Sequence, residues 1–226
     1  ARRKRTRKPA LMHPIRVTFT LDRPITQTDR PIHLDAILGY IATREAMAQN
    51  KDPDLALENL PLAKAVSPDD WIFQASQLIP TTPTIPLGEI LFVRKFEPIV
   101  WARDRELGHW QSKQTNFVGG TGKNKAFKLA IPLEQQRELT AWAIVTDTER
   151  FTALLNQVDG IGKSRRNGYG HVDTITVSAD PTAWENWKMR SLPAGIPPTP
   201  NHYASMTTTR PPYWDRSKWK KGYCYH

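Results

Sequence analysis

The glycine-rich segment 160–170, with the sequence GIGKSRRNGYG, contains the residue types best suited to bind a phosphate. Glycines permit positive φ angles and let backbone N–H groups approach an anion closely. Basic side chains add positive charge, and an aromatic ring can stack on a base or pack beneath the loop. The segment therefore predicts binding of a phosphate-bearing ligand by Gly160, Gly162, Lys163, Arg165, Arg166, Gly168, Tyr169 and Gly170. A tight helix-to-strand connection whose basic residues face water is the alternative, and the charge density favours binding.

Two partial matches to a nucleotide-binding loop fail on spacing. The residues Gly162-Lys163-Ser164 resemble the end of a Walker loop, but the first required glycine falls on Gln157. The pair Gly122-Lys123 fails as well, because the last required position is Asn124. The sequence therefore does not indicate a nucleoside triphosphatase.

Positive charge is concentrated at the two ends of the chain. The 226 residues carry a net charge of +10. Residues 1–8 hold six basic side chains and no acidic one, and residues 210–221 hold five basic side chains against Asp215. These two segments account for the whole excess, which indicates a polyanionic partner.

The remaining body is neutral but unevenly charged. Residues 94–128 carry eight Lys or Arg against three acids, whereas residues 29–70 carry eight acids against four bases. A polyanion on the basic side and a protein neighbour on the acidic side would explain this pattern. A solvated surface with local charge patterning is the alternative.

Composition excludes several classes of protein. With one cysteine, Cys224, the chain cannot form an intrachain disulfide or a multi-cysteine metal site. No apolar run approaches the roughly 18 residues of a membrane helix, and the first residues are basic, unlike a signal peptide. We expect a cytoplasmic protein without a metal, a cofactor or a membrane partner.

Hydrophobic periodicity predicts alternating strands and helices. Strands are expected at 15–21, 71–76, 89–96, 127–131, 139–145 and 171–177, and helices at 33–48 and 148–158. Two split β-α-β units in this order predict an α+β fold, a ferredoxin-like (RRM-type) sandwich with an antiparallel sheet. We expect a basic arm at 1–14, a domain at 15–180 with a flexible basic insertion around 97–131, and an extension at 181–226. The proline-rich part of that extension is expected to become ordered on contact and to form no second core.

Aromatic and basic residues alternate near the C-terminus. The aromatic residues are Tyr213, Trp214, Trp219, Tyr223 and Tyr225, and the basic ones are Arg210, Arg216, Lys218, Lys220 and Lys221. Aromatic faces stack on bases while basic groups follow phosphates. Packing of these rings onto the domain or a partner subunit is the equally weighted alternative.

The pattern G-x-G-x5-G-x-G before the last expected strand resembles the CRISPR-associated RAMP proteins, which bind CRISPR RNA on ferredoxin-like folds. The segment 31–40 (PIHLDAILGY), after a short first strand, resembles more particularly the type IV effector complexes. Among their subunits, it is most similar to the single-copy RAMP that caps the filament and holds the 5′ handle of the guide RNA. The resemblance covers roughly residues 15–177.

This resemblance implies a non-catalytic RNA-binding subunit. The loop at 160–170 would clamp the 5′ handle of the CRISPR RNA. The basic insertion would correspond to a thumb-like element that binds RNA through Lys113, Lys123, Lys125 and Lys128. The implied partners are a backbone RAMP subunit, the large-subunit counterpart and target DNA where unwinding starts.

Two other functions remain open from the sequence. Some relatives cut CRISPR RNA without metal, and His33 has a suitable position to accept the 2′-hydroxyl proton. Lys163 or Arg165 would then stabilise the charged phosphorane. A histidine at a helix start more often bonds the backbone. The other alternative is a general structural ribonucleoprotein subunit with basic extensions.

Overall fold

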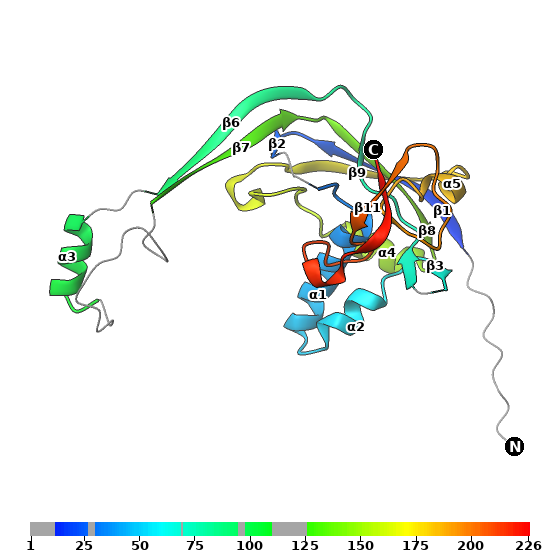
Figure 1. Ribbon diagram of the computed structural model, residues 1–226, viewed down its shortest axis with the longest axis horizontal. Coiled ribbons are helices and arrows are strands. Elements are labelled where there is room, and N and C mark those ends of the chain that lie inside the picture. The colour runs from blue at the N-terminus through cyan, green and yellow to red at the C-terminus, as the bar shows by residue number, and fades with distance from the viewer. Residues whose placement is uncertain (1–11, 27–29, 69, 95–97, 110–125) are drawn as a thin grey trace, which may run out of the picture. The chain divides into compact units, whose positions relative to one another are not determined.

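The computed structural model describes residues 12–26, 30–68, 70–94, 98–109 and 126–226 (Figure 1). The chain divides into two compact units, Ala1–Ile85 with Glu134–His226 and, separately, Pro86–Leu133. The predicted α+β class with antiparallel sheets is confirmed. The expected arm at 1–14 lies mostly outside the described residues, and the first strand already begins at His13.

The main sheet of the first unit has the strand order β5-β8-β1-β9. Its strands are β1 (His13–Leu21), β5 (Ile79–Pro80), β8 (Glu138–Val145) and β9 (Val172–Ala179). In the antiparallel register, Val17 lies opposite Ala141 on one side and Val177 on the other. The alternation predicted for 15–21 is confirmed, because its apolar residues are buried and the intervening ones are less so.

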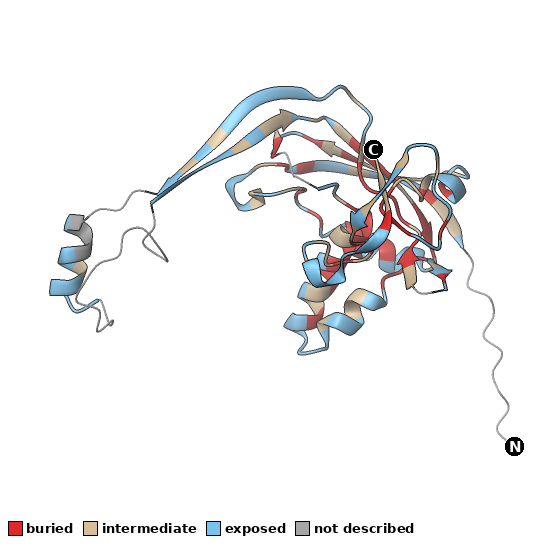
Figure 2. Ribbon diagram, viewed as in Figure 1, coloured by how far each residue is buried: buried red, intermediate tan, exposed pale blue. Residues whose placement is uncertain are grey.

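Two helices pack on this sheet and complete the core (Figure 2). They are α1 (Leu34–Ala48), which buries Leu34 and Leu38, and α4 (Thr148–Leu155), which buries Phe151 and Leu154. The side chain of Asp147 caps α4 by accepting from the Arg150 N–H at 2.9 Å. The expected helix at 148–158 ends three residues early, in a turn.

Smaller elements surround this core. The short helix α2 (Pro53–Glu58) packs against α1. A hairpin joins β3 (Lys64–Ser67) to β4 (Asp70–Phe73), and β2 (Ile25–Thr26) follows β1. The strand expected at 71–76 is therefore shorter than predicted, because Ala75 makes only an isolated bridge to Ala143.

The C-terminal region forms its own small sheet, so the predicted coreless tail was wrong. Helix α5 (Ala183–Asn186) precedes a sheet in the order β10-β12-β11. Its strands are β10 (Leu192–Pro193), β11 (His202–Thr207) and β12 (Lys220–Tyr225), with the 3-10 turn η3 (Arg216–Lys218) before β12. Trp187, Leu192 and Ile196 bury a second apolar cluster with Ile72 and Ile144 of the main domain. The prolines interrupt periodicity without preventing this packing.

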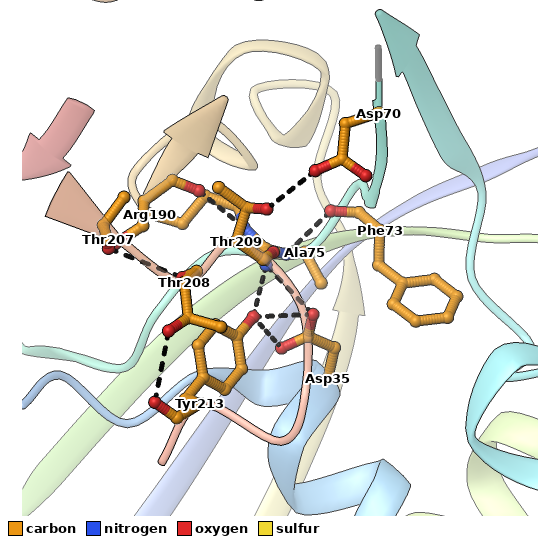
Figure 3. A network of polar contacts seen from close by, with 10 residues as sticks. Asp35, Asp70, Phe73, Ala75, Arg190, Thr207, Thr208, Thr209 and Tyr213 are labelled. Carbon is orange, nitrogen blue, oxygen red and sulfur yellow. Dashed lines mark hydrogen bonds and ion pairs between the residues drawn. The ribbon is translucent and has the colours of Figure 1, made fainter. Parts of the chain in front are cut away.

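The fully buried Arg190 joins the C-terminal region to the main domain (Figure 3). Its guanidinium pairs with Asp35 Oδ2 at 3.0 Å, in the first turn of α1. It also donates to main-chain carbonyl oxygens of Phe73 at 2.7 Å, Ala75 at 2.8 Å and Thr209 at 2.7 Å. One side chain thus connects α1, the segment after β4 and the C-terminal chain.

Tyr213 completes this network (Figure 3). Its hydroxyl donates to both Asp35 carboxylate oxygens at 2.9 Å and accepts a hydrogen bond from Arg190. Burial raises the pKa of Tyr213 well above its ordinary value, so the hydroxyl keeps its proton. The network therefore fixes the C-terminal chain at Tyr213 directly against the start of α1.

Asp70 makes a second connection to the C-terminal chain. Its carboxylate accepts from Thr209 Oγ1 at 3.2 Å and pairs with Arg210 at 3.2 Å and Lys220 at 3.4 Å. With Asp35 also buried and paired, part of the acidity predicted for a protein-binding face at 29–70 is neutralised within the chain. The acidic side is therefore smaller than the sequence suggests.

The second unit contains most of a two-stranded ribbon and a helix. The ribbon pairs β6 (Ile85–Arg94) with β7 (Phe127–Gln135), and α3 (Pro98–Glu106) follows β6. The insertion predicted around 97–131 falls in this unit, where the sequence analysis expected no helix. Leu87, Leu91, Val93, Phe127 and Leu129 are each between 47% and 56% exposed on the ribbon.

Replacing Arg190 by alanine should destabilise the chain strongly. The change leaves the Asp35 carboxylate and three carbonyl oxygens without their buried donor, a loss of about 3–5 kcal/mol in the free energy of unfolding. Arg150→Ala is the matched control, because its ion pair with Glu45 is partly exposed and should cost less than about 1 kcal/mol. Urea unfolding of both variants measures the difference, and equal losses would contradict the assigned role of Arg190.

Candidate functional site

The glycine loop 160–170 closes on itself between α4 and β9. Gly160 makes an antiparallel bridge with His171, and the Ile161 N–H donates to the Gly170 carbonyl at 2.8 Å. The Gly170 N–H in turn donates to the Pro24 carbonyl at 2.7 Å, which ties the loop to the chain after β1. The loop is thus a closed, anchored turn, consistent with its predicted place between a helix and a strand.

Two of the glycines are required by close approach. Gly170 has a φ of +62°, and a Cβ there would lie 2.0 Å from the Ile161 carbonyl oxygen. Gly162 has a φ of +89°, and its Cβ would lie 3.0 Å from the Ile25 side chain of β2. These two glycines therefore give the loop its shape.

The three basic residues of the loop have different environments. Arg165 lies over the Tyr40 ring at 4.6 Å and donates to the Gly160 carbonyl at 3.3 Å, so it joins the loop to α1. Lys163 is exposed, and its carbonyl accepts from Thr26 Oγ1 at 2.9 Å. Arg166, in the 3-10 turn η2 (Arg165–Asn167), is exposed and makes no ion pair with any residue that the structure describes. The guanidinium of Arg166 is therefore exposed to solvent.

The other predicted RNA contacts are Tyr169, within the loop, and four lysines of the insertion. Tyr169 is half-buried. Lys128 is an exposed residue of β7 in the second unit. Lys113, Lys123 and Lys125 lie outside the described residues. The thumb-like role of the insertion therefore stays a prediction.

His33 occupies the N-cap position of α1 and is only 2% exposed. Its ring stacks on Tyr213, with centroids 4.1 Å apart and planes at 9°. Within the described part of the chain, neither ring nitrogen makes a hydrogen bond of normal geometry. Burial, reinforced by the positive charge of Arg190, lowers the pKa of His33 well below its usual range. The imidazole is therefore neutral at pH 7, and neighbouring atoms cover both of its ring nitrogens.

A groove that the sequence analysis did not predict lies beside His33. We call it the α1–turn groove: it has a volume of about 790 Å³ and is bounded by α1, α2, the glycine loop and the 211–216 turn. Its lining residues include Arg30, Ile32, His33, Tyr40, Leu57, Lys163, Trp214 and Arg216. The alternation of aromatic and basic residues near the C-terminus was the signal for it, but the partner surface on α1 could not be located from sequence.

The C-terminal aromatic residues divide between packing and exposure. Tyr213 belongs to the Arg190 network and Tyr223 packs against the second apolar cluster. Tyr225 makes an edge contact with His202 at 5.2 Å. Trp214 and Trp219 remain 77% and 40% exposed. Packing therefore holds for the three tyrosines, and stacking of bases on the exposed Trp214 and Trp219 stays a prediction.

Residues 13–225 match the family model described as CRISPR type IV associated protein Csf3. The chain belongs to the Csf3 family. Csf3 membership makes it a type IV CRISPR-associated subunit, and the match spans both units and the C-terminal sheet. A search of curated proteins found no match. Among the helices of the described residues, the Csf3 chain has none with the length and apolarity to span a membrane.

Replacing His33 by phenylalanine should flatten the pH dependence of stability. Below pH 6.5 the unfolded chain binds a proton at His33 that the folded chain does not, so the free energy of unfolding falls as pH falls. The variant should lose a slope of up to about 1.4 kcal/mol per pH unit. At pH 7 it should be no less stable, because an unpaired buried polar ring is replaced by an apolar one.

Urea unfolding between pH 5 and pH 8 measures this effect. His226→Phe is the control, because His226 is exposed. If the free energy of unfolding changes with pH in the same way in wild type and in His33→Phe, then folding does not lower the pKa of His33 and this prediction is wrong.

Proposed function

We propose that this Csf3-family chain is a non-catalytic RNA-binding subunit of a type IV CRISPR ribonucleoprotein. It holds the 5′ handle of the guide RNA and caps the backbone filament beside the large-subunit counterpart. The observation that carries the proposal is the glycine loop, on which Lys163 and Arg166 are both exposed and Lys163 also lines the α1–turn groove. Exposed cations on an anchored loop suit the backbone of a single-stranded RNA.

The topology supports a ferredoxin-like fold for this subunit. The strands β1, β5, β8 and β9 with α1 and α4 follow the chain order β-α-β-β-α-β. Their order in the sheet places β1 and β8 in the middle, each flanked by an antiparallel neighbour. We propose on this basis that the first unit is a RAMP domain with C-terminal additions.

Binding without cleavage is favoured by the state of His33. A general base must reach the proton it removes. The ring nitrogens of His33 are buried under neighbouring atoms, and the lowered pKa makes the ring a weaker base. We therefore propose a binding role for this part of the chain, and membership of the Csf3 family replaces the general ribonucleoprotein alternative.

The ribbon of the second unit has exposed apolar side chains that could contact a protein partner. Five of its large apolar side chains are about half exposed, and contiguous exposed apolar surface is typical of interaction sites. We propose that the ribbon contacts the backbone RAMP subunit. Contact with target DNA, which the resemblance implies, and a cytoplasmic location, which composition suggests, stay predictions.

Binding to the handle should be specific and leave the RNA intact. The full chain is incubated in EDTA at physiological salt with repeat-derived 5′-handle RNA or with a scrambled RNA. We expect tighter binding to the handle and no cleavage. Cleavage of the handle that is lost in His33→Ala would contradict the non-catalytic role, and equal binding to both RNAs would contradict handle recognition.

Arg166→Ala should weaken binding of the handle through loss of one phosphate contact. The slope of log K against log salt should become flatter by about 0.7. Lys188→Ala is the charge-matched control, because Lys188 follows α5, beyond the end of β9 remote from the glycine loop. An unchanged affinity and slope in Arg166→Ala would remove the loop from the RNA interface.

Replacing Leu91 and Leu129 by glutamate should block assembly with the backbone subunit. Both residues are about half exposed, so the isolated chain should keep its unfolding temperature. Co-purification with the backbone subunit measures assembly. Normal co-purification of the double variant would show that the ribbon is not the contact.

A further inference from the structure

The α1–turn groove combines an apolar slot with charge of one predominant sign. Its lining holds three cationic side chains, Arg30, Lys163 and Arg216, and one acidic side chain, Asp54. We propose that this groove binds one unstacked base of the handle RNA, with the adjoining phosphates on Lys163 and Arg216. The inference rests on the proposed RNA-binding function and adds the place where a base is held.

The aromatic side chains of the groove provide surfaces for stacking. Trp214 leaves its indole 77% exposed, and Tyr40 is 43% exposed on α1. Arg165 and Arg44 lie over the Tyr40 ring at 4.6 Å and 5.6 Å. Single-stranded RNA is recognised by stacking of splayed bases on aromatic rings and on guanidinium planes. The groove thus has the groups that a base face requires.

The size of the groove fits a nucleotide. Its volume of about 790 Å³ lies within the roughly 300–1,000 Å³ of pockets for small organic ligands. Ile32 and Leu57 add apolar lining, which favours a flat base over a hydrated phosphate inside the slot. Arg30 is held at the wall of the groove, because it donates to the Tyr213 carbonyl and lies over the Trp219 ring at 5.3 Å.

His33 provides an independent sign that the groove takes a polar ligand. It lines the groove, is 2% exposed, and has no hydrogen bond at either ring nitrogen to the residues described. A neutral imidazole has one donor and one acceptor, which complements the edge of a base. Both nitrogens are covered. A base edge can therefore reach them only when the 211–216 turn moves and Tyr213 gives up its hydrogen bonds to Asp35.

Charge argues against the N-terminal arm of the same chain as the occupant. Residues 1–8 carry six basic side chains and no acid. The cationic lining of the groove would repel such a segment. A polyanion with a flat apolar face is the better match, and RNA has both properties.

A double-mutant cycle that combines a protein variant with RNAs lacking single bases tests the proposal. Handle RNAs that each lack one base are bound to the full chain and to Trp214→Ala. In wild type, loss of the base that occupies the groove should weaken binding about 5- to 150-fold, the equivalent of roughly 1–3 kcal/mol of stacking. In Trp214→Ala the same loss should have less than about a twofold further effect, because the interaction is already absent.

The controls separate this inference from the proposed function. Trp184→Ala removes an exposed indole from α5 and should keep the wild-type profile. Arg166→Ala should weaken all RNAs alike. If the handle binds normally and no position responds to Trp214→Ala, the base site is wrong and the proposed function stands. If the intact handle shows no preference over a scrambled RNA, both fail.

His33→Phe tests the contact with the base edge. The substitution keeps a ring stacked on Tyr213 and removes both nitrogens. The four bases are placed in turn at the sensitive position, and their affinities are compared. We expect the ratio of the tightest to the weakest of these four affinities to fall at least threefold in His33→Phe. An unchanged spread would show that His33 does not contact the base.

Discussion

The buried pair of Arg190 and Asp35 holds the two halves of the first unit in place. Both side chains are fully buried, so each requires the other as a charge partner. The guanidinium also satisfies carbonyl oxygens from the segment after β4 and from Thr209. Because Tyr213 bonds both Asp35 oxygens, the chain after β11 must pass over the start of α1.

This constraint creates the α1–turn groove. Once Tyr213 is fixed on Asp35, its ring covers His33 and the next residue, Trp214, is held beside α1. The glycine loop contacts the same helix through Arg165, which lies over the Tyr40 ring. Residues far apart in the sequence thus border one groove. We propose that a Csf3-family subunit uses this surface for the handle of its guide RNA.

Local patterns in the sequence predicted the elements of the core but not the contacts between distant segments. Alternation at 15–21 and helical spacing at 33–48 are properties of neighbouring residues, and β1 and α1 follow them closely. The C-terminal sheet was missed because its short strands lie among prolines and depend on the burial of Arg190. A buried arginine has no local signature, since its partner Asp35 is 155 residues away. The position of the glycine loop between a helix and a strand was predicted correctly. The groove beside it was not, because it depends on the passage of the C-terminal chain over α1 at Tyr213.

Photo-cross-linking of handle RNA tests the central claim most directly. The full chain is irradiated with 4-thiouridine-labelled handle or scrambled RNA, and the cross-linked peptides are identified by mass spectrometry. The account predicts handle-dependent cross-links in peptides that contain residues 160–170 and 211–216. Cross-links confined to the basic residues 1–8, or identical for the two RNAs, would contradict it.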